Sequence, residues 1–106
     1  MSRALIVAKI RHGAERDVAR VFADSDAGPL PRDAGVLERS LYVLNDLYVH
    51  VVDFEREIDE SMESLRGRPE FRDIGRRLEP YIAAYDPETW RSPKDAMARR
   101  FYHWQA

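Results

Sequence analysis

The sequence contains no cysteine among its 106 residues, which excludes disulfides, catalysis by a thiol and thiolate metal ligands. No apolar run approaches the roughly 20 residues of a membrane-spanning helix, and the apolar start is too short for a signal peptide. Lys and Arg are spread along a chain of net charge -2, without the basic stripe that neutralises a phosphate backbone. We therefore expect a soluble, cytoplasmic protein with no membrane or nucleic-acid partner.

The composition, 44% hydrophobic and 34% charged residues, is typical of one globular domain spanning residues 1–106 around one core. Its centre is a pair of apolar runs on either side of Asn45 and Asp46, which predicts a β-hairpin over Val36–Phe54. A two-residue turn at this place would pair Leu41 with His50 and would put Arg39 on the same sheet face as His50. Diagonal cross-strand neighbours have Cα atoms about 7–8 Å apart, so these two side chains can meet.

The remaining elements follow from apolar spacing and from turn residues. Arg3–Ile10 is expected to be a strand buried on both faces. A helix follows it and ends before Gly28. A second helix, after the hairpin, is broken at Gly67 and continues from Pro69 to Pro80. The aromatic end of the chain, Ala98–Trp104, is expected to be the fourth strand.

This order, β-α-β-β-α-β, predicts an α+β fold of the ferredoxin-like type with a four-stranded antiparallel sheet. One sheet face should pack on the helices. The other face carries a run of mostly apolar hairpin residues, namely Ser40, Tyr42, Leu44, Leu47, Val49 and Val51. An uncovered apolar patch of that extent is unfavourable in a monomer. We therefore expect a homodimer whose sheets pack face to face, or, as the alternative, a monomer that uses its C-terminal tail as a lid.

Six stretches of the sequence resemble the small polyketide cyclases of aromatic polyketide pathways. They are Phe22–Asp26, Gly35–Arg39, Asp46–His50, Arg68–Phe71, Leu78–Tyr81 and Phe101–Trp104. The resemblance covers nearly the whole chain and implies a fold of the dimeric α/β-barrel type and no cofactor. It also implies a poly-β-ketone or partly cyclised substrate, bacterial antibiotic or spore-pigment biosynthesis, and a transient contact with an acyl carrier protein or ketosynthase. One departure is Ser25, where the family pattern has a histidine before the aspartate.

Arg39, His50 and Asp26 are the candidate catalytic residues. A guanidinium stays charged and can bind an enolate or ketone oxygen, and an imidazole can move a proton near neutral pH. Tyr48 and Phe22 are expected to line the substrate site. Each residue also has a structural interpretation. His50 can be a satisfied core histidine, Asp26 a turn or cap residue, and Tyr48 part of the core, while Arg39 can pair with a neighbouring carboxylate.

Two further histidines, His12 and His103, show no metal-ligand spacing with His50. Three functions remain open at this point. The first is a cofactor-free cyclase that directs aldol closure and dehydration of a polyketide. The second is a cofactor-independent monooxygenase of an anthrone-like polyphenol, since one fold hosts several chemistries. The third is a non-catalytic dimer that binds a small molecule.

Overall fold

The computed structural model describes the whole chain, Met1 to Ala106. Its elements, in chain order, are β1 (Ser2–Ile10), α1 (Glu15–Asp26), α2 (Leu30–Ala34), β2 (Val36–Leu44), β3 (Leu47–Phe54), α3 (Ile58–Leu65), α4 (Pro69–Leu78), β4 (Ile82–Ala84) and the 3₁₀ turn η1 (Pro93–Ala96). The strands form one antiparallel sheet in the order β2-β3-β1-β4. This confirms the α+β fold and the βαββαβ order.

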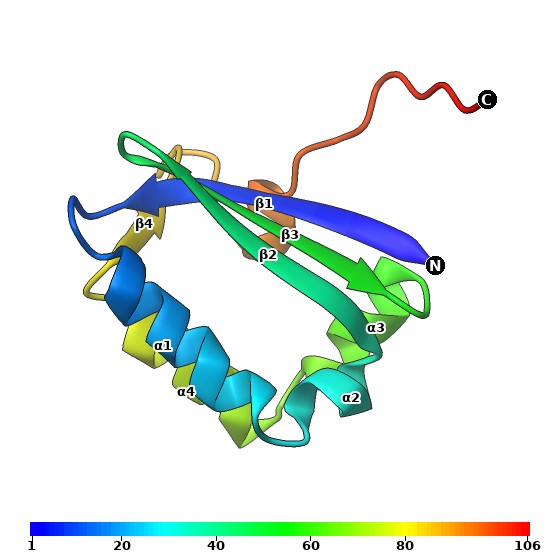
Figure 1. Cartoon of the computed structure of the whole chain (residues 1–106), viewed down its shortest axis with the longest axis horizontal. Helices are drawn as coiled ribbons and strands as arrows, with labels where there is room; N and C mark the ends of the chain where they lie inside the picture. Colours follow the sequence, from blue (N-terminus) through cyan, green and yellow to red (C-terminus); the bar gives the residue numbers. More distant parts are fainter.

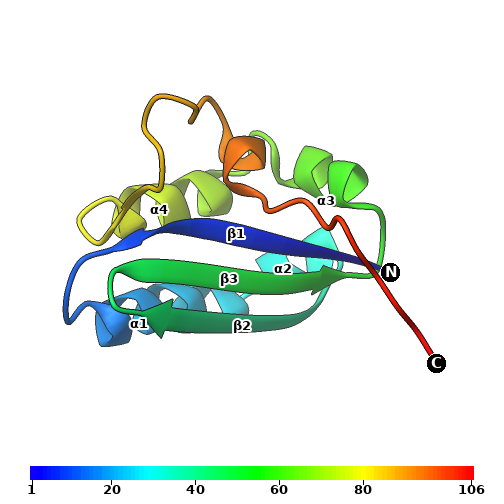
Figure 2. The ribbon, with the colours of Figure 1, turned by 90° about the horizontal axis from the view of Figure 1, so that it is seen from above.

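The helices lie on one side of the sheet (Figure 1), and the view from above shows α1 and α2 behind the strands (Figure 2). Small and apolar residues on the inner face of β1 contact α1, which packs beside α4. The buried cluster there comprises Ala8, Ile10, Ala14, Val18, Phe22 and Tyr48. Close packing of this layer fixes the distance between α1 and β3. No helix of the chain is both long and apolar enough to cross a membrane.

The hairpin has the predicted register. Leu44 lies opposite Leu47, Leu41 opposite His50 and Arg39 opposite Val52. Asn45 occupies the left-handed region with φ of 55°, which an asparagine tolerates and which two-residue hairpin turns require. The two-residue turn is therefore confirmed, and with it the shared face of Arg39 and His50.

The prediction of the fourth strand is wrong. β4 is the short segment Ile82–Ala84, which pairs with Ala8–Ile10 of β1. The chain then leaves the sheet and forms one further antiparallel bridge to β1, between Ile6 and Met97. Residues 98–106 form no regular element. Aromatic residues favour a strand only where a pleated, half-buried surface receives them, and this chain offers none to its own tail.

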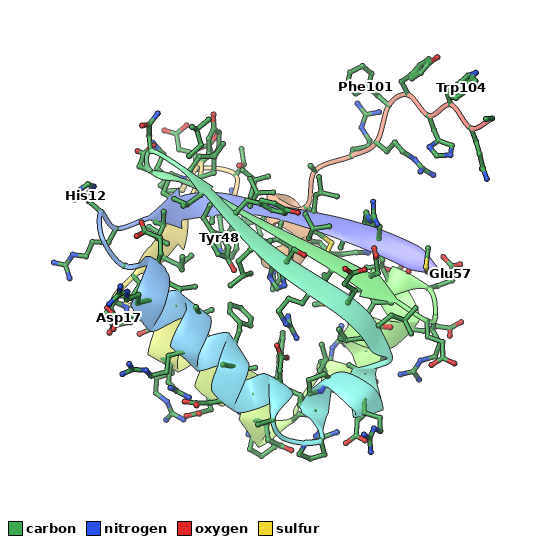
Figure 3. The ribbon with its side chains drawn as sticks, viewed as in Figure 1. His12, Asp17, Tyr48, Glu57, Phe101 and Trp104 are labelled. Carbon is green, nitrogen blue, oxygen red and sulfur yellow. The ribbon has the colours of Figure 1, made fainter.

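The C-terminal tail extends away from the body (Figures 1 and 2), and the side chains of Phe101 and Trp104 project from it (Figure 3). Phe101 is 89% exposed and Trp104 is 71% exposed. The tail thus does not fold back over the open sheet face, so the lid interpretation is not what the structure shows.

Two smaller expectations are also corrected. β1 is not buried on both faces, because Ala4 and Ala8 face the helices whereas Leu5 is exposed on the open side. The prolines after α1 do not simply end helical structure. Pro31 lies in the first turn of α2, where its missing N–H is not needed, and Gly35, at φ of 76°, ends this helix before β2.

Candidate active site

The helix-facing side of the hairpin carries three polar side chains among apolar ones. Arg39 comes from β2, and Tyr48 and His50 come from β3. Tyr48 and His50 are buried, and Tyr48 lies beneath the strands, on the side of the helices, in Figure 3. Side chains alternate across a strand, so the hairpin register alone brings these groups to one face.

Helix α1 supplies the acidic partner of this group. Asp26 is the last residue of α1, and its carboxylate accepts hydrogen bonds from Arg39 Nε, at 3.1 Å to Oδ2, and from Nη2, at 2.9 Å to Oδ1. This two-pronged contact matches the planar fork of a guanidinium to a carboxylate. The Arg39 side chain is only 15% exposed, whereas that of Asp26 is 41% exposed. The ion pair therefore runs from the surface toward the interior and fixes the guanidinium.

The inner end of the guanidinium reaches the imidazole. Arg39 Nη1 lies 2.9 Å from His50 Nε2. The Phe22 ring closes the other side, with its centroid 4.9 Å from Arg39 Cζ and 5.0 Å from the His50 ring in an edge-on arrangement. A cation over an aromatic face is attracted to it. Four residues from α1, β2 and β3 thus form one contiguous cluster, which we call the Asp26–Arg39–His50 cluster, with Phe22 as its apolar wall.

The pKa of His50 is well below its ordinary value. Burial disfavours the imidazolium, and the positive charge of Arg39 adds to this, so that the pKa falls from 6.5 to about 3. Burial likewise raises the pKa of the Tyr48 hydroxyl, against a smaller opposing effect of Arg39. Both groups are neutral at pH 7. The low pKa of His50 therefore argues against the expectation that this residue takes up a proton near neutral pH.

Other carboxylates near Arg39 have different partners or none. Asp53 pairs with Arg3 across β1 and β3, with Oδ1 2.6 Å from Nε and Oδ2 3.0 Å from Nη2. Glu38 forms no salt bridge with Arg39. Asp26 was predicted from the sequence as a candidate catalytic residue, but its pairing with Arg39 was not predicted. The signal was weak, since an aspartate at a helix end is usually a cap or turn residue.

The other histidines lie elsewhere. His12 is in the loop between β1 and α1 (Figure 3). His103 is in the tail, where its Nδ1 lies 3.2 Å from Arg100 Nη1. No group of three or more His, Asp or Glu side chains is arranged to hold a metal ion.

A cavity beside β1 does not contain the cluster. It has a volume of about 250 Å³ and lies along the edge of β1, where Val7, Tyr85, Trp90 and Met97 are among its lining residues. The expectation that Arg39 and His50 share a sheet face is confirmed. Their place in a substrate cavity stays a prediction.

Comparison with known proteins gives a consistent result. Residues 2–105 match the profile of the family described as polyketide synthesis cyclase. The chain is 50% identical over 106 residues to an uncharacterized protein of Streptomyces coelicolor, covering 99% of this chain and 96% of that one. It is 48% identical over 105 residues to the polyketide synthase CurG of Streptomyces cyaneus, covering 99% and 98%.

A relative with a named reaction is tetracenomycin F2 cyclase of Streptomyces glaucescens, which is 34% identical over 104 residues and covers 98% of this chain and 94% of its own length. Its solved structure, described as a type II polyketide cyclase, superposes with a TM-score of 0.89 over 100% of this chain and 99% of that one, at 33% identity. The cofactor-independent oxygenase SnoaB of Streptomyces nogalater gives a TM-score of 0.57 at 20% identity, covering 79% and 87%. This second likeness concerns the fold alone.

Proposed function

Because this chain belongs to the polyketide synthesis cyclase family, we propose that it directs a regiospecific intramolecular aldol cyclisation of a poly-β-ketone or a partly cyclised intermediate, followed by dehydration. A methylene between two carbonyls loses a proton, and its carbon bonds to a carbonyl carbon further along the chain. The new alkoxide takes a proton, and loss of water makes the ring aromatic. The product would belong to bacterial aromatic polyketide biosynthesis, as an antibiotic or a spore pigment.

The observation that carries this proposal is the fixed cation at the inner face of the sheet. A guanidinium has five N–H groups, and the contacts to Asp26 and His50 leave one hydrogen on Nη1 and one on Nη2 of Arg39 unused. These hydrogens can bind an enolate or alkoxide oxygen. Since Asp26 and Phe22 already hold the guanidinium, little reorganisation is needed when charge develops on the substrate.

The orientation of the two reacting groups of the substrate should have the largest influence on the reaction rate and on which product forms. Holding two reacting groups in line can supply about 7–11 kcal/mol, whereas one general acid or base contributes roughly 10²–10⁴ in rate. The hydrogen between two carbonyls is already acidic, and the free chain cyclises without help into mixtures. The enzyme's main task is then to select which carbon meets which carbonyl.

The test compares two variants with a poly-β-ketone substrate and chromatography of the products. Arg39→Ala should lower the yield of the single main product, or shift the product ratio, more than His50→Ala does. Arg3→Ala is the matched control, because Arg3 also forms a two-pronged pair with an aspartate but lies outside the cluster. Wild-type product ratios in both cluster variants would contradict the proposed role.

We also propose that the protein works as a homodimer whose open sheet faces pack together. Tyr42 and Leu44 on that face are 59% and 68% exposed, and the tail emerges on the same side of the sheet (Figure 1). Aromatic side chains such as Phe101 and Trp104 would then lie against the second copy. A carrier protein or ketosynthase that delivers the substrate remains a further proposed partner.

The alternative function is that of a cofactor-independent monooxygenase. The oxygenase SnoaB has a similar fold, but no feature of this chain favours that reaction over the cyclisation. Oxygen uptake with a reduced tricyclic phenol distinguishes the two reactions, because the cyclisation consumes no oxygen. A binding module without catalysis would show retention of the polyketide with no change in the product distribution.

A further inference from the structure

Arginine cannot accept a hydrogen bond, and this fixes the state of its imidazole partner. Every nitrogen of a guanidinium is a donor. At 2.9 Å from Arg39 Nη1, His50 Nε2 must present its lone pair, because an N–H on both sides would place two hydrogens against each other. In a neutral imidazole the single proton is then on Nδ1. His50 is therefore a donor at Nδ1 and has no free basic nitrogen.

The Nδ1 atom of His50 is also not fully enclosed by the chain. It makes no hydrogen bond within the chain, and the only fully buried side-chain nitrogen or oxygen without a partner is Ser61 Oγ. Nδ1 must consequently touch accessible space, although the residue as a whole is buried. The same holds for the Tyr48 hydroxyl, which makes no hydrogen bond either and whose ring centroid is 6.2 Å from that of His50.

We infer that His50 acts on the substrate as a neutral hydrogen-bond donor through Nδ1–H, and that Arg39, held by Asp26, is the positioning residue that locks this tautomer. The substrate atom would be a carbonyl oxygen that becomes an enolate or alkoxide. The identity of that oxygen rests on the proposed cyclase function, whereas the tautomer does not. This inference assigns His50 the part of an electrophile instead of a base.

The charges around His50 agree with this assignment. Arg39 faces it from β2, and the carboxylate of Asp26 from α1 lies on the far side of the guanidinium. On the other sides are the Phe22 ring from α1 and the neutral Tyr48 from β3. No carboxylate contacts the imidazole directly, so nothing nearby stabilises an imidazolium. A neutral imidazole as a donor to a developing oxyanion is an established catalytic device.

The first test reads the tautomer directly, by nitrogen-15 NMR of the histidine side chains in the intact protein. The chain has three histidines, and His50→Asn identifies the signal of interest. We expect His50 to carry its proton on Nδ1 and to show no titration between pH 5 and 8. A proton on Nε2, or a titration near pH 6.5, in the wild type would overturn the inference whatever the enzyme's activity.

Replacing Arg39 should allow His50 to adopt the other tautomer. In Arg39→Met the lock and the nearby positive charge are both lost, so the Nε2–H form should appear and the pKa of His50 should rise from about 3 toward 6.5. Arg3→Met is the matched control and should leave the His50 signals unchanged. Arg39→Lys keeps a donor and a charge, and it should retain more of the Nδ1–H form than Arg39→Met. An unchanged tautomer in Arg39→Met would show that Arg39 does not set it.

The second test separates a donor from a base. The amide nitrogen of asparagine is attached at Cγ, as Nδ1 is in histidine, so His50→Asn keeps a donor near the original place and removes any basic nitrogen. We expect kcat in His50→Asn within about tenfold of wild type, and a loss of about 10²–10³ in His50→Leu, the usual cost of one oxyanion donor. Equal losses in both variants would overturn the donor role. If no variant, wild type included, turns over a polyketide while the Nδ1–H tautomer is observed, the cyclase function fails and the tautomer assignment stands.

Discussion

The two faces of the β2–β3 hairpin are built from alternate residues of the same two strands but present opposite kinds of surface. On the inner face Arg39, Tyr48 and His50 are enclosed and the charges are paired within the chain. On the outer face Tyr42 and Leu44 are largely exposed. One polypeptide thus pairs the charge of Arg39 on its inner face but leaves apolar side chains exposed on its outer face. The inner face is explained by the chain alone, and the outer face calls for a second molecule.

The largest effect is expected from the inner face. Phe54 at the end of β3 is 4% exposed and packs with Ala4 and Val52. Phe54→Ala should lower the free energy of unfolding by about 3–5 kcal/mol, because it leaves a cavity as well as losing apolar contact. Denaturant unfolding measures this. The matched control on the outer face is Leu44→Ala, which should change the stability of the isolated chain by no more than about 0.5 kcal/mol. Equal losses in the two variants would show that the two faces do not differ as described.

The outer face should matter for association instead. We expect the wild type to sediment at micromolar concentration with twice the chain mass of 12.4 kDa. Leu44→Lys should sediment as a monomer, since each copy would bring an unpaired ammonium group into an apolar contact. Ala19→Lys adds the same charge on an exposed position of α1 and should remain dimeric. A monomeric wild type, or a dimeric Leu44→Lys variant, would remove the sheet-to-sheet interface.

The difference between the two hairpin faces could be predicted from the sequence because it depends on the turn and on the neighbouring residues of the chain. Asn45 and Asp46 between two apolar runs fix the turn, the turn fixes the register, and the register decides which side chains share a face. Arg39 and His50 were assigned to one face for that reason.

The remaining features depend on parts of the chain that meet only after folding. The pairing of Asp26 with Arg39 requires α1 to pack at a particular place under β2, and spacing along the sequence does not encode this. The low pKa of His50 results from burial and from Arg39 together. β4 is a three-residue strand of modest propensity, whereas the aromatic tail has high propensity but no partner. In both cases tertiary context outweighs local preference.

The smallest effect is expected at Ser25, next to the acidic end of the cluster. The resemblance to the family implies a histidine at this position. Ser25 lies in the last turn of α1, and its hydroxyl makes no hydrogen bond within the chain. Serine cannot exchange protons near neutrality, so a required acid or base at this position would make the protein inactive. If orientation by the cluster dominates instead, the residue next to Asp26 should matter little.

We therefore expect Ser25→Ala to keep kcat within about tenfold of wild type, a barrier change of about 1.4 kcal/mol, and Ser25→His to raise it by no more than that. Initial rates with the same polyketide substrate measure both, and Asp26→Asn serves as the comparison because it weakens the ion pair that holds Arg39. A hundredfold gain in Ser25→His would mean that proton transfer at the end of α1 limits the reaction. In that case the inner face would act through acid-base chemistry as well as through a fixed set of donors, and the ranking of orientation above proton transfer would be wrong.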